Sequence, residues 1–158
     1  MDGAGVHVSP PACARHGCHR VAARRRARHS EAPERNSLML PPVFAALKAS
    51  PAVTALIGSS PLRAYRHGAA PQAVARPYVT WSAPGGSPEN AFDGACADVF
   101  RVQVDCWSDT DAGVEALAVA VRAALEPSAH LVAYVADERD FETQRFRISF
   151  QFDWILKR

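Results

Sequence analysis

The segment from Gln144 to Leu156 constrains the fold of this chain most, because apolar and polar residues alternate along it. A period of two residues places successive side chains on opposite faces of a β-strand. We therefore predict a long strand with one strongly apolar face and one polar face. The apolar set is Phe146, Ile148, Phe150, Phe152 and Trp154, and the polar set is Arg145, Arg147, Ser149, Gln151 and Asp153.

The length of this strand sets a second constraint. At about 3.3 Å per residue it spans roughly 43 Å, whereas a compact domain of about 120 residues is only about 35 Å across. We expect the strand to bend, to twist strongly or to protrude, and protrusion into a neighbouring subunit is one hypothesis.

The rest of the core sequence predicts three helices and further strands. Prolines and Ser50 indicate two short helices before Gly58, and polar residues from Ser108 to Asp111 begin a longer helix that Glu126 and Pro127 end. The strands are expected at 62–66, 77–83, 98–107 and 130–136, with a charged turn from Asp137 to Asp140. The predicted class is α+β: an antiparallel or mixed sheet of four to five strands, packed by one long helix and two short N-terminal helices.

Residues 84–97 contain three glycines and two prolines. This composition predicts a mobile loop about twice as long as an ordinary connection. Because long loops on small domains often carry function, this segment is a candidate contact surface.

Residues 1–38 differ from the rest of the chain. They hold seven arginines against three acidic residues, whereas residues 39–158 hold 11 basic and 13 acidic residues. Few large apolar side chains are present before Met39, so we predict a disordered Arg-rich tail. Two alternatives stay open: translation of upstream sequence before a true start at Met39, and a nucleic-acid or lipid-surface arm that uses residues 23–28.

Neither a membrane span nor a cofactor site is indicated. No apolar run approaches the roughly 18 to 20 residues that cross a bilayer, and the basic residues follow, rather than precede, the only weakly apolar stretch near the start. The four cysteines are expected as reduced thiols, with Cys106 buried in a strand. The histidines and cysteines at positions 13, 16, 18 and 19 stand too close together for a usual zinc site.

Sequence signatures of common enzyme classes are absent. There is no nucleophile elbow, phosphate-binding loop, zinc-protease motif or dinucleotide fingerprint. The run from Asp109 to Gly113 departs from a calcium loop and is better explained as helix capping. His67 and His130 are the histidines of the core region, and neither belongs to a recognisable nucleophile arrangement. We predict a protein without catalytic activity.

Several ordered blocks from Met39 onward resemble those of the small bacteriophage tail-completion proteins, also called tail terminators. The blocks are MLPPVFAALKASPAVTALIG, YRHG, ARPYVTW, VQVDCW, TDAGVEALA, AVRAALEP and FRISFQFDW. This resemblance implies helices packed on an antiparallel sheet and assembly into a ring, typically of six copies. Such a ring caps the tail tube and presents a surface to the head connector. It also implies a tail-completion domain over residues 39–158, in a chain that begins near Met39.

The resemblance implies the partners of the protein. These are other copies of the chain, the tail-tube protein and the head connector or neck protein, in the virion tail and, during assembly, in the host cytoplasm. Six globules about 35 Å wide leave a central opening of similar width, so DNA is expected to pass through without specific binding. A nearly neutral core suits such a conduit, because each neutralised phosphate adds binding that hinders sliding. We select as candidate assembly interface Glu89, Asn90, Phe92, Asp93, Arg145, Arg147 and Gln151.

Two other functions are weighed against this one. A nucleic-acid-binding module would use the Arg-rich segment 1–38, and its DNA affinity would fall steeply with salt. A small enzyme using His67 or His130 would need a pocket with a perturbed acid or base, and no motif supports it.

Overall fold

A computed structural model describes residues 40–92 and 94–158 of the chain. The predictions on the segment 1–38, on Cys13 and Cys18 and on Asp93 therefore lie outside the described residues. The elements in chain order are α1 (Val43–Ala49), α2 (Pro51–Ile57), β1 (Ala64–Arg66), β2 (Tyr78–Ala91), β3 (Gly94–Ser108), α3 (Asp111–Leu125), β4 (His130–Arg139) and β5 (Phe146–Lys157).

The helices begin where capping residues were expected. Ser50 Oγ accepts a hydrogen bond from the Val53 amide at 3.4 Å, and Pro51 occupies the first position of α2. Thr110 Oγ1 accepts from the Gly113 amide at 3.2 Å at the start of α3. Each cap satisfies an amide that has no partner within its helix. The three predicted helices are confirmed.

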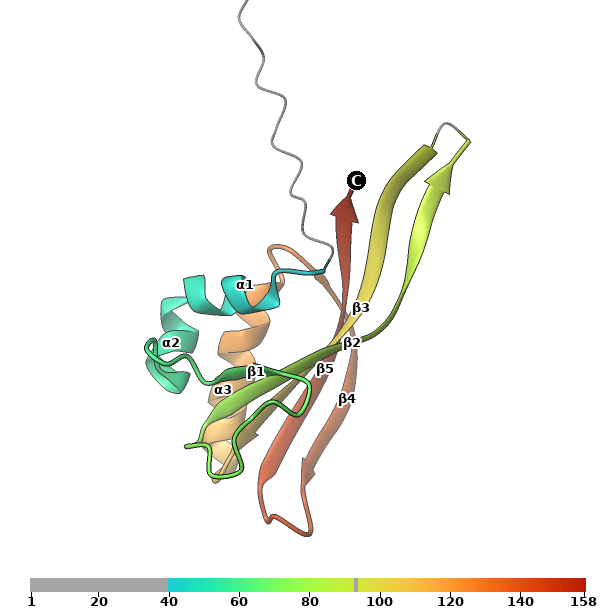
Figure 1. Ribbon diagram of the computed structural model, residues 1–158. Coiled ribbons are helices and arrows are strands. Elements are labelled where there is room, and N and C mark those ends of the chain that lie inside the picture. The colour runs from blue at the N-terminus through green and yellow to red at the C-terminus, as the bar shows by residue number, and fades with distance from the viewer. Residues whose placement is uncertain (1–39, 93) are drawn as a thin grey trace, which may run out of the picture. The chain divides into compact units, whose positions relative to one another are not determined.

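The sheet has five strands in the order β1-β2-β3-β5-β4. The β1–β2 pair is parallel, and the other three pairs are antiparallel. The helices lie together on one face of this sheet (Figure 1). The α+β class with a mixed five-stranded sheet is thereby confirmed. None of the helices in residues 40–92 and 94–158 has the length and hydropathy needed to cross a membrane.

The hydrophobic core lies between the helices and the covered face of the sheet. Alternate residues of β5, namely Phe150, Phe152 and Trp154, are buried there as their period of two predicts. Phe146 and Ile148 of the same apolar set are only partly buried at the edge of the core. Cys106 is fully buried, as expected, and its burial raises the pKa of the thiol.

The predicted loop at 84–97 is instead a β-hairpin, which corrects the expectation. Residues of β2 as far as Ala91 pair with β3 as far back as Gly94, and this hairpin extends away from the rest of the sheet (Figure 1). We call residues 85–98 the β2–β3 arm. A Cβ on Gly86 would lie 2.4 Å from the Val99 carbonyl oxygen, so the glycine permits close approach of the two strands. Glycine and proline are compatible with an edge strand that contains bulges.

The other strand boundaries also differ from expectation. The charged turn predicted at Asp137–Asp140 is wrong for its first three residues, because β4 continues to Arg139. The turn occupies residues 140–145, where Asp140 Oδ1 accepts a hydrogen bond from the Thr143 amide at 2.6 Å. The hydrogen bond from the Thr143 hydroxyl, followed by the one from its amide, lowers the pKa of Asp140. The last strand, β5, pairs with β3 along its whole length, from Phe146 to Lys157. The segment that extends beyond this pairing is the β2–β3 arm (Figure 1).

Candidate assembly surfaces

The arm holds the first group of residues that the sequence selected. Glu89 and Asn90 lie on β2 of the arm and are exposed. Phe92 lies in the turn between β2 and β3 and has a relative exposure of 115%, the full value for an isolated residue. This aromatic ring is not buried by any described part of the chain and is available to a partner. Asp93 is outside the described residues.

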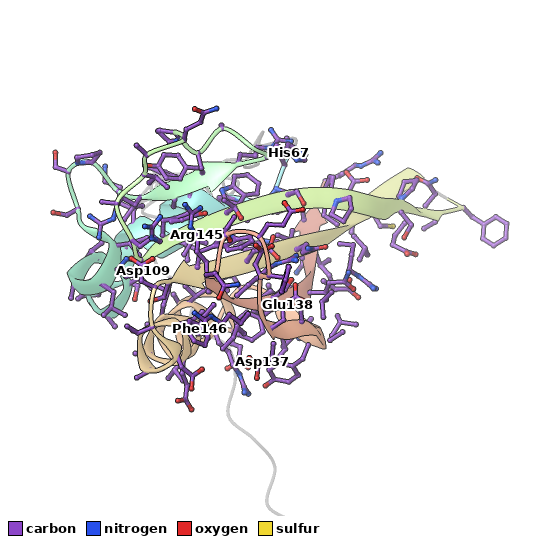
Figure 2. All side chains as sticks on the ribbon, turned by 90° about the horizontal axis from the view of Figure 1, so that it is seen from below. His67, Asp109, Asp137, Glu138, Arg145 and Phe146 are labelled. Atoms are coloured by element: carbon purple, nitrogen blue, oxygen red, sulfur yellow. The ribbon has the colours of Figure 1, made fainter. Side chains whose placement is uncertain are left out.

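The second group of selected residues lies at the other end of the sheet. In the β3–β5 ladder, Ala97 pairs with Lys157 next to the arm, whereas Ser108 pairs with Phe146 at the far end. Arg145 directly precedes β5 at this far end (Figure 2). The structure therefore separates the six described candidates into an arm group and a group on or beside β5, rather than gathering them into one site.

Arg147 and Gln151 of the second group belong to the sheet face that no helix covers. Arg147 forms ion pairs with Asp105 at 2.8 Å and with Glu138 at 3.2 Å. Gln151 stands opposite Gln103 in the β3–β5 ladder.

Further pairs join strands on the same open face. Arg101 bonds Asp153, and Trp107 Nε1 donates to Thr80 Oγ1 at 3.1 Å. Because these charges are matched within the chain, the open face offers phosphate groups few unpaired cations.

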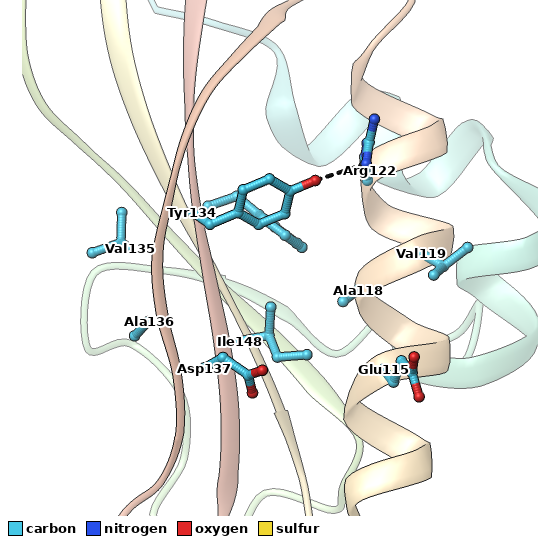
Figure 3. A pocket seen from close by; sticks show the side chains of 10 residues that line it. Glu115, Ala118, Val119, Arg122, Tyr134, Val135, Ala136, Asp137 and Ile148 are labelled. Atoms are coloured by element: carbon cyan, nitrogen blue, oxygen red, sulfur yellow. Dashed lines mark hydrogen bonds between the residues drawn. The ribbon is translucent and has the colours of Figure 1, made fainter.

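An apolar groove lies between α3 and β4 (Figure 3). Its volume is about 340 Å³. Val119, Tyr134 and Val135 line it and keep 66%, 64% and 47% of their surface exposed. The Tyr134 hydroxyl accepts a hydrogen bond from Arg122 Nη1 at 2.7 Å, which fixes the ring across the groove.

Sequence reasoning missed this groove, although one signal was present. Val119 is an apolar residue of α3 outside the helical stripe that faces the core, and a large apolar side chain on the outer side of a helix is worth questioning. Tyr134 gave no such signal, because its exposure depends on β4 being an edge strand.

Acidic residues are distributed unevenly along the chain, and the two segments that differ supply different edge strands of the sheet. Residues 40–88 contain four basic residues and no acidic one, whereas residues 89–158 contain seven basic and 13 acidic residues. The first region includes β1, at one edge of the sheet, and the second includes β4, at the other edge. Figure 2 shows His67, beside β1, and Asp137, on β4, on opposite sides of the molecule. The segments that contain the two edges therefore differ in charge, although Asp109 pairs with Arg76 in the loop after β1.

The two histidines considered for catalysis do not meet. His67 follows β1 with a φ of 38°, and His130 begins β4 at the opposite sheet edge. Both are exposed. Among residues 40–92 and 94–158, no group of three or more His, Cys, Asp and Glu side chains is arranged to hold a metal ion.

Comparison with known proteins identifies the family. The sequence matches the family described as "Tail completion protein gp17" over residues 41–157. The chain belongs to this phage tail-completion family. The resemblance found in the sequence is thus confirmed, and the protein is a structural component of a phage tail. No curated protein matches the chain.

The tail-completion fold also has a solved counterpart. A chain of the "Virion of native gene transfer agent (GTA) particle" aligns with a TM-score of 0.56 at 21% sequence identity. The alignment covers 73% of this tail-completion chain and 92% of that chain. At this level of identity the comparison supports the fold, and the family match supports the role in the tail.

Proposed function

We propose that this tail-completion protein assembles into a homo-oligomeric ring, with six copies as the leading stoichiometry, that terminates the tail tube and joins it to the head. The observation that carries the proposal is the β2–β3 arm of a chain in this family. Its strands are paired and ordered, yet residues 84–91 of β2 are exposed throughout. An exposed apolar tip such as Phe92 is best explained by a partner that covers it.

The position of the two hairpin turns supports contacts on two sides of the ring. The β2–β3 turn carries Phe92, and the β4–β5 turn carries Phe141, which is 89% exposed. The ladder register places these turns at opposite ends of the sheet. One end would contact the tail-tube protein and the other the head connector, in the virion tail and, before that, in the host cytoplasm.

The open face of the sheet supports passage of DNA without specific binding. Its arginines, Arg101 and Arg147, are engaged by carboxylates of the same chain. A surface with paired charges releases few counterions on contact with DNA, so binding to it is weak. The proposed role is mechanical and needs neither catalysis nor a cofactor.

The mass of the assembly tests this proposal. The full chain would be measured by native mass spectrometry at micromolar concentration, alone and with the tail-tube protein. We expect a closed oligomer in at least one of these conditions. A monomer in both would contradict ring assembly.

A second function rests on the run from Arg24 to Arg28, which lies outside the described residues. In this alternative the segment 1–38 binds nucleic acid. Deleting this segment separates the two functions: loss of a salt-dependent DNA affinity would favour the alternative, whereas unchanged assembly would favour the tail function. N-terminal sequencing of the native protein would show whether translation begins at Met39.

A further inference from the structure

We infer that neighbouring copies join head to tail, with the β1 edge of one copy covering the α3–β4 groove of the next. This inference rests on the proposed ring and names its two contact surfaces. The basic surface consists of β1 and the following loop, residues 64–77. The acidic surface consists of the groove between α3 and β4 with the two carboxylates beside it, Glu115 and Asp137.

The acidic surface combines exposed apolar side chains with the backbone of an edge strand. Tyr134 and Val135 are about half exposed or more, on the same strand. That strand, β4, pairs only with β5 and is therefore an edge strand of the sheet. An edge strand beside an exposed apolar groove readily associates with another surface unless it is covered.

The carboxylates beside the groove determine which kind of surface can cover it. Glu115 and Asp137 line the groove from its two sides, are exposed, and form no ion pair with any described residue (Figure 3). Arg122, the one basic residue of the lining, is already paired with Glu126 at 2.7 Å. The groove therefore favours a partner with cations and few anions.

The β1 edge of the same protein has this chemistry at Arg66, because Arg76, the other arginine of residues 64–77, is already paired with Asp109. No acidic residue occurs from residue 40 to residue 88, and the exposed Arg66 lies over the Trp81 ring at 5.3 Å. The loop that follows β1 exposes small apolar residues suited to a shallow apolar groove. They are Ala69, Pro71, Ala73 and Ala75. Basic and apolar groups thus occur together on this edge, as acidic and apolar groups do on the other.

A second copy must supply the contact, because the two surfaces are at opposite edges of one sheet. Such a contact joins two different surfaces, so it repeats from copy to copy and closes into a ring when the rotation permits. The arm is a weaker candidate for the groove. Exposed Glu89 gives the arm the same charge as Glu115 and Asp137 give the groove.

Charge reversal tests the contact. One variant carries Arg66→Glu, and the other carries Glu115→Lys with Asp137→Lys. All three positions are exposed, so both variants should fold, and circular dichroism would check this. Under conditions in which the wild-type chain assembles, each variant alone should associate roughly tenfold more weakly or worse, because like charges then face each other. The matched control Lys48→Glu reverses an exposed charge on α1, outside both surfaces, and should assemble as the wild type does.

Mixing the two variants in equal amounts gives the decisive result. Every contact in an alternating ring then joins opposite charges, so assembly should return, with equal numbers of the two chains in native mass spectra. Variants that assemble alone like the wild type, or a mixture that stays dissociated, would overturn this contact while leaving the proposed ring intact. A wild-type chain that stays monomeric with the tube protein would instead overturn the proposed function and this inference with it.

Discussion

The two halves of β2 differ sharply in burial. From Tyr78 to Trp81 the strand packs into the core, with Val79 fully buried. From Pro84 to Ala91 every residue is exposed, although pairing with β3 continues. The register shifts between Ser82 and Gly85, so a bulge separates the two halves. The first half of β2 therefore contributes side chains to the core, whereas the second half is exposed.

This difference shows that backbone pairing and core burial are independent sources of order. A two-stranded hairpin alone is marginally stable in water, and the arm has no core beneath it. The C-terminus supplies part of its support: the Arg158 amide donates to the Cys96 carbonyl at 3.1 Å, and Arg158 Nε donates to Asp98 at 2.7 Å. We expect changes in the core to affect folding and changes in the arm to affect assembly.

The largest expected effect is the loss of stability caused by a substitution in the core. Phe152→Ala removes a fully buried ring from β5 and should lower the free energy of unfolding by about 3–5 kcal/mol. Denaturant titration measures this change. Ile155→Ala, on the same strand but 49% exposed, is the control and should change the free energy of unfolding by only about 0.5 kcal/mol. Equal losses for both variants would contradict the assigned core.

Within the arm, Gly86→Ala should have a strong local effect. The added Cβ would meet the Val99 carbonyl oxygen, a backbone atom that cannot rotate away, and the resulting strain should cost about 1–3 kcal/mol, as overpacking does in cores. Hydrogen exchange should show loss of amide protection in residues 85–98, with the core unchanged. Gly85→Ala is the matched control, because its Cβ would meet no atom within 4 Å. Equal exchange in the two variants would mean that the strands do not approach closely at Gly86.

Phe92→Ser tests whether the arm tip serves contact rather than folding. Since Phe92 is fully exposed, the free energy of unfolding should change by less than about 0.5 kcal/mol. Ring formation or binding to tube protein should nevertheless weaken. Phe44→Ser, at a partly exposed position on α1, serves as the comparison for removing an aromatic ring from the surface. Unchanged binding by Phe92→Ser would show that the tip is not a contact.

The smallest expected effect is a pH dependence at the base of the arm. Hydrogen bonding from Arg158 lowers the pKa of Asp98, and partial desolvation opposes this effect. Because the folded-state pKa is lowered, the stabilising contribution is complete above the ordinary carboxyl pKa of about 3.9 and is lost as pH falls through the lowered value. Arm amides should therefore exchange faster, relative to the core, in strongly acidic solution. Asp98→Asn should abolish this relative change, and a persistent change would assign it to another group.

Local sequence patterns predicted most of the elements in this fold. Ser50 and Thr110 cap helices because their hydroxyls lie within three residues of the amides that they satisfy. The alternation in β5 predicted the side chains that face the core. The prediction of a loop at 84–97 was wrong. A high content of glycine and proline indicates a loop on average, but here the pairing of β2 with β3 stabilises a hairpin.

The candidate interface stays a prediction, and the structure shows only where its described residues lie. Phe92 lies on an exposed tip, as a contact residue should, but Arg147 is engaged in ion pairs within its own chain. The groove at Tyr134 was not predicted, because its exposure follows from the place of β4 in the strand order.

The sequence by itself determined the caps, the buried face of β5 and the family, because these depend on residues close together in the chain or on ordered blocks along it. The tertiary structure decided that β1, from the acid-free segment, and β4, from the acidic segment, are the two edge strands of one sheet, and that Glu115 and Asp137 line one groove. The physical reason is strand order. Strand order depends on pairing between segments that are distant in the chain. Local side-chain patterns therefore do not determine which strands lie at the edges of the sheet.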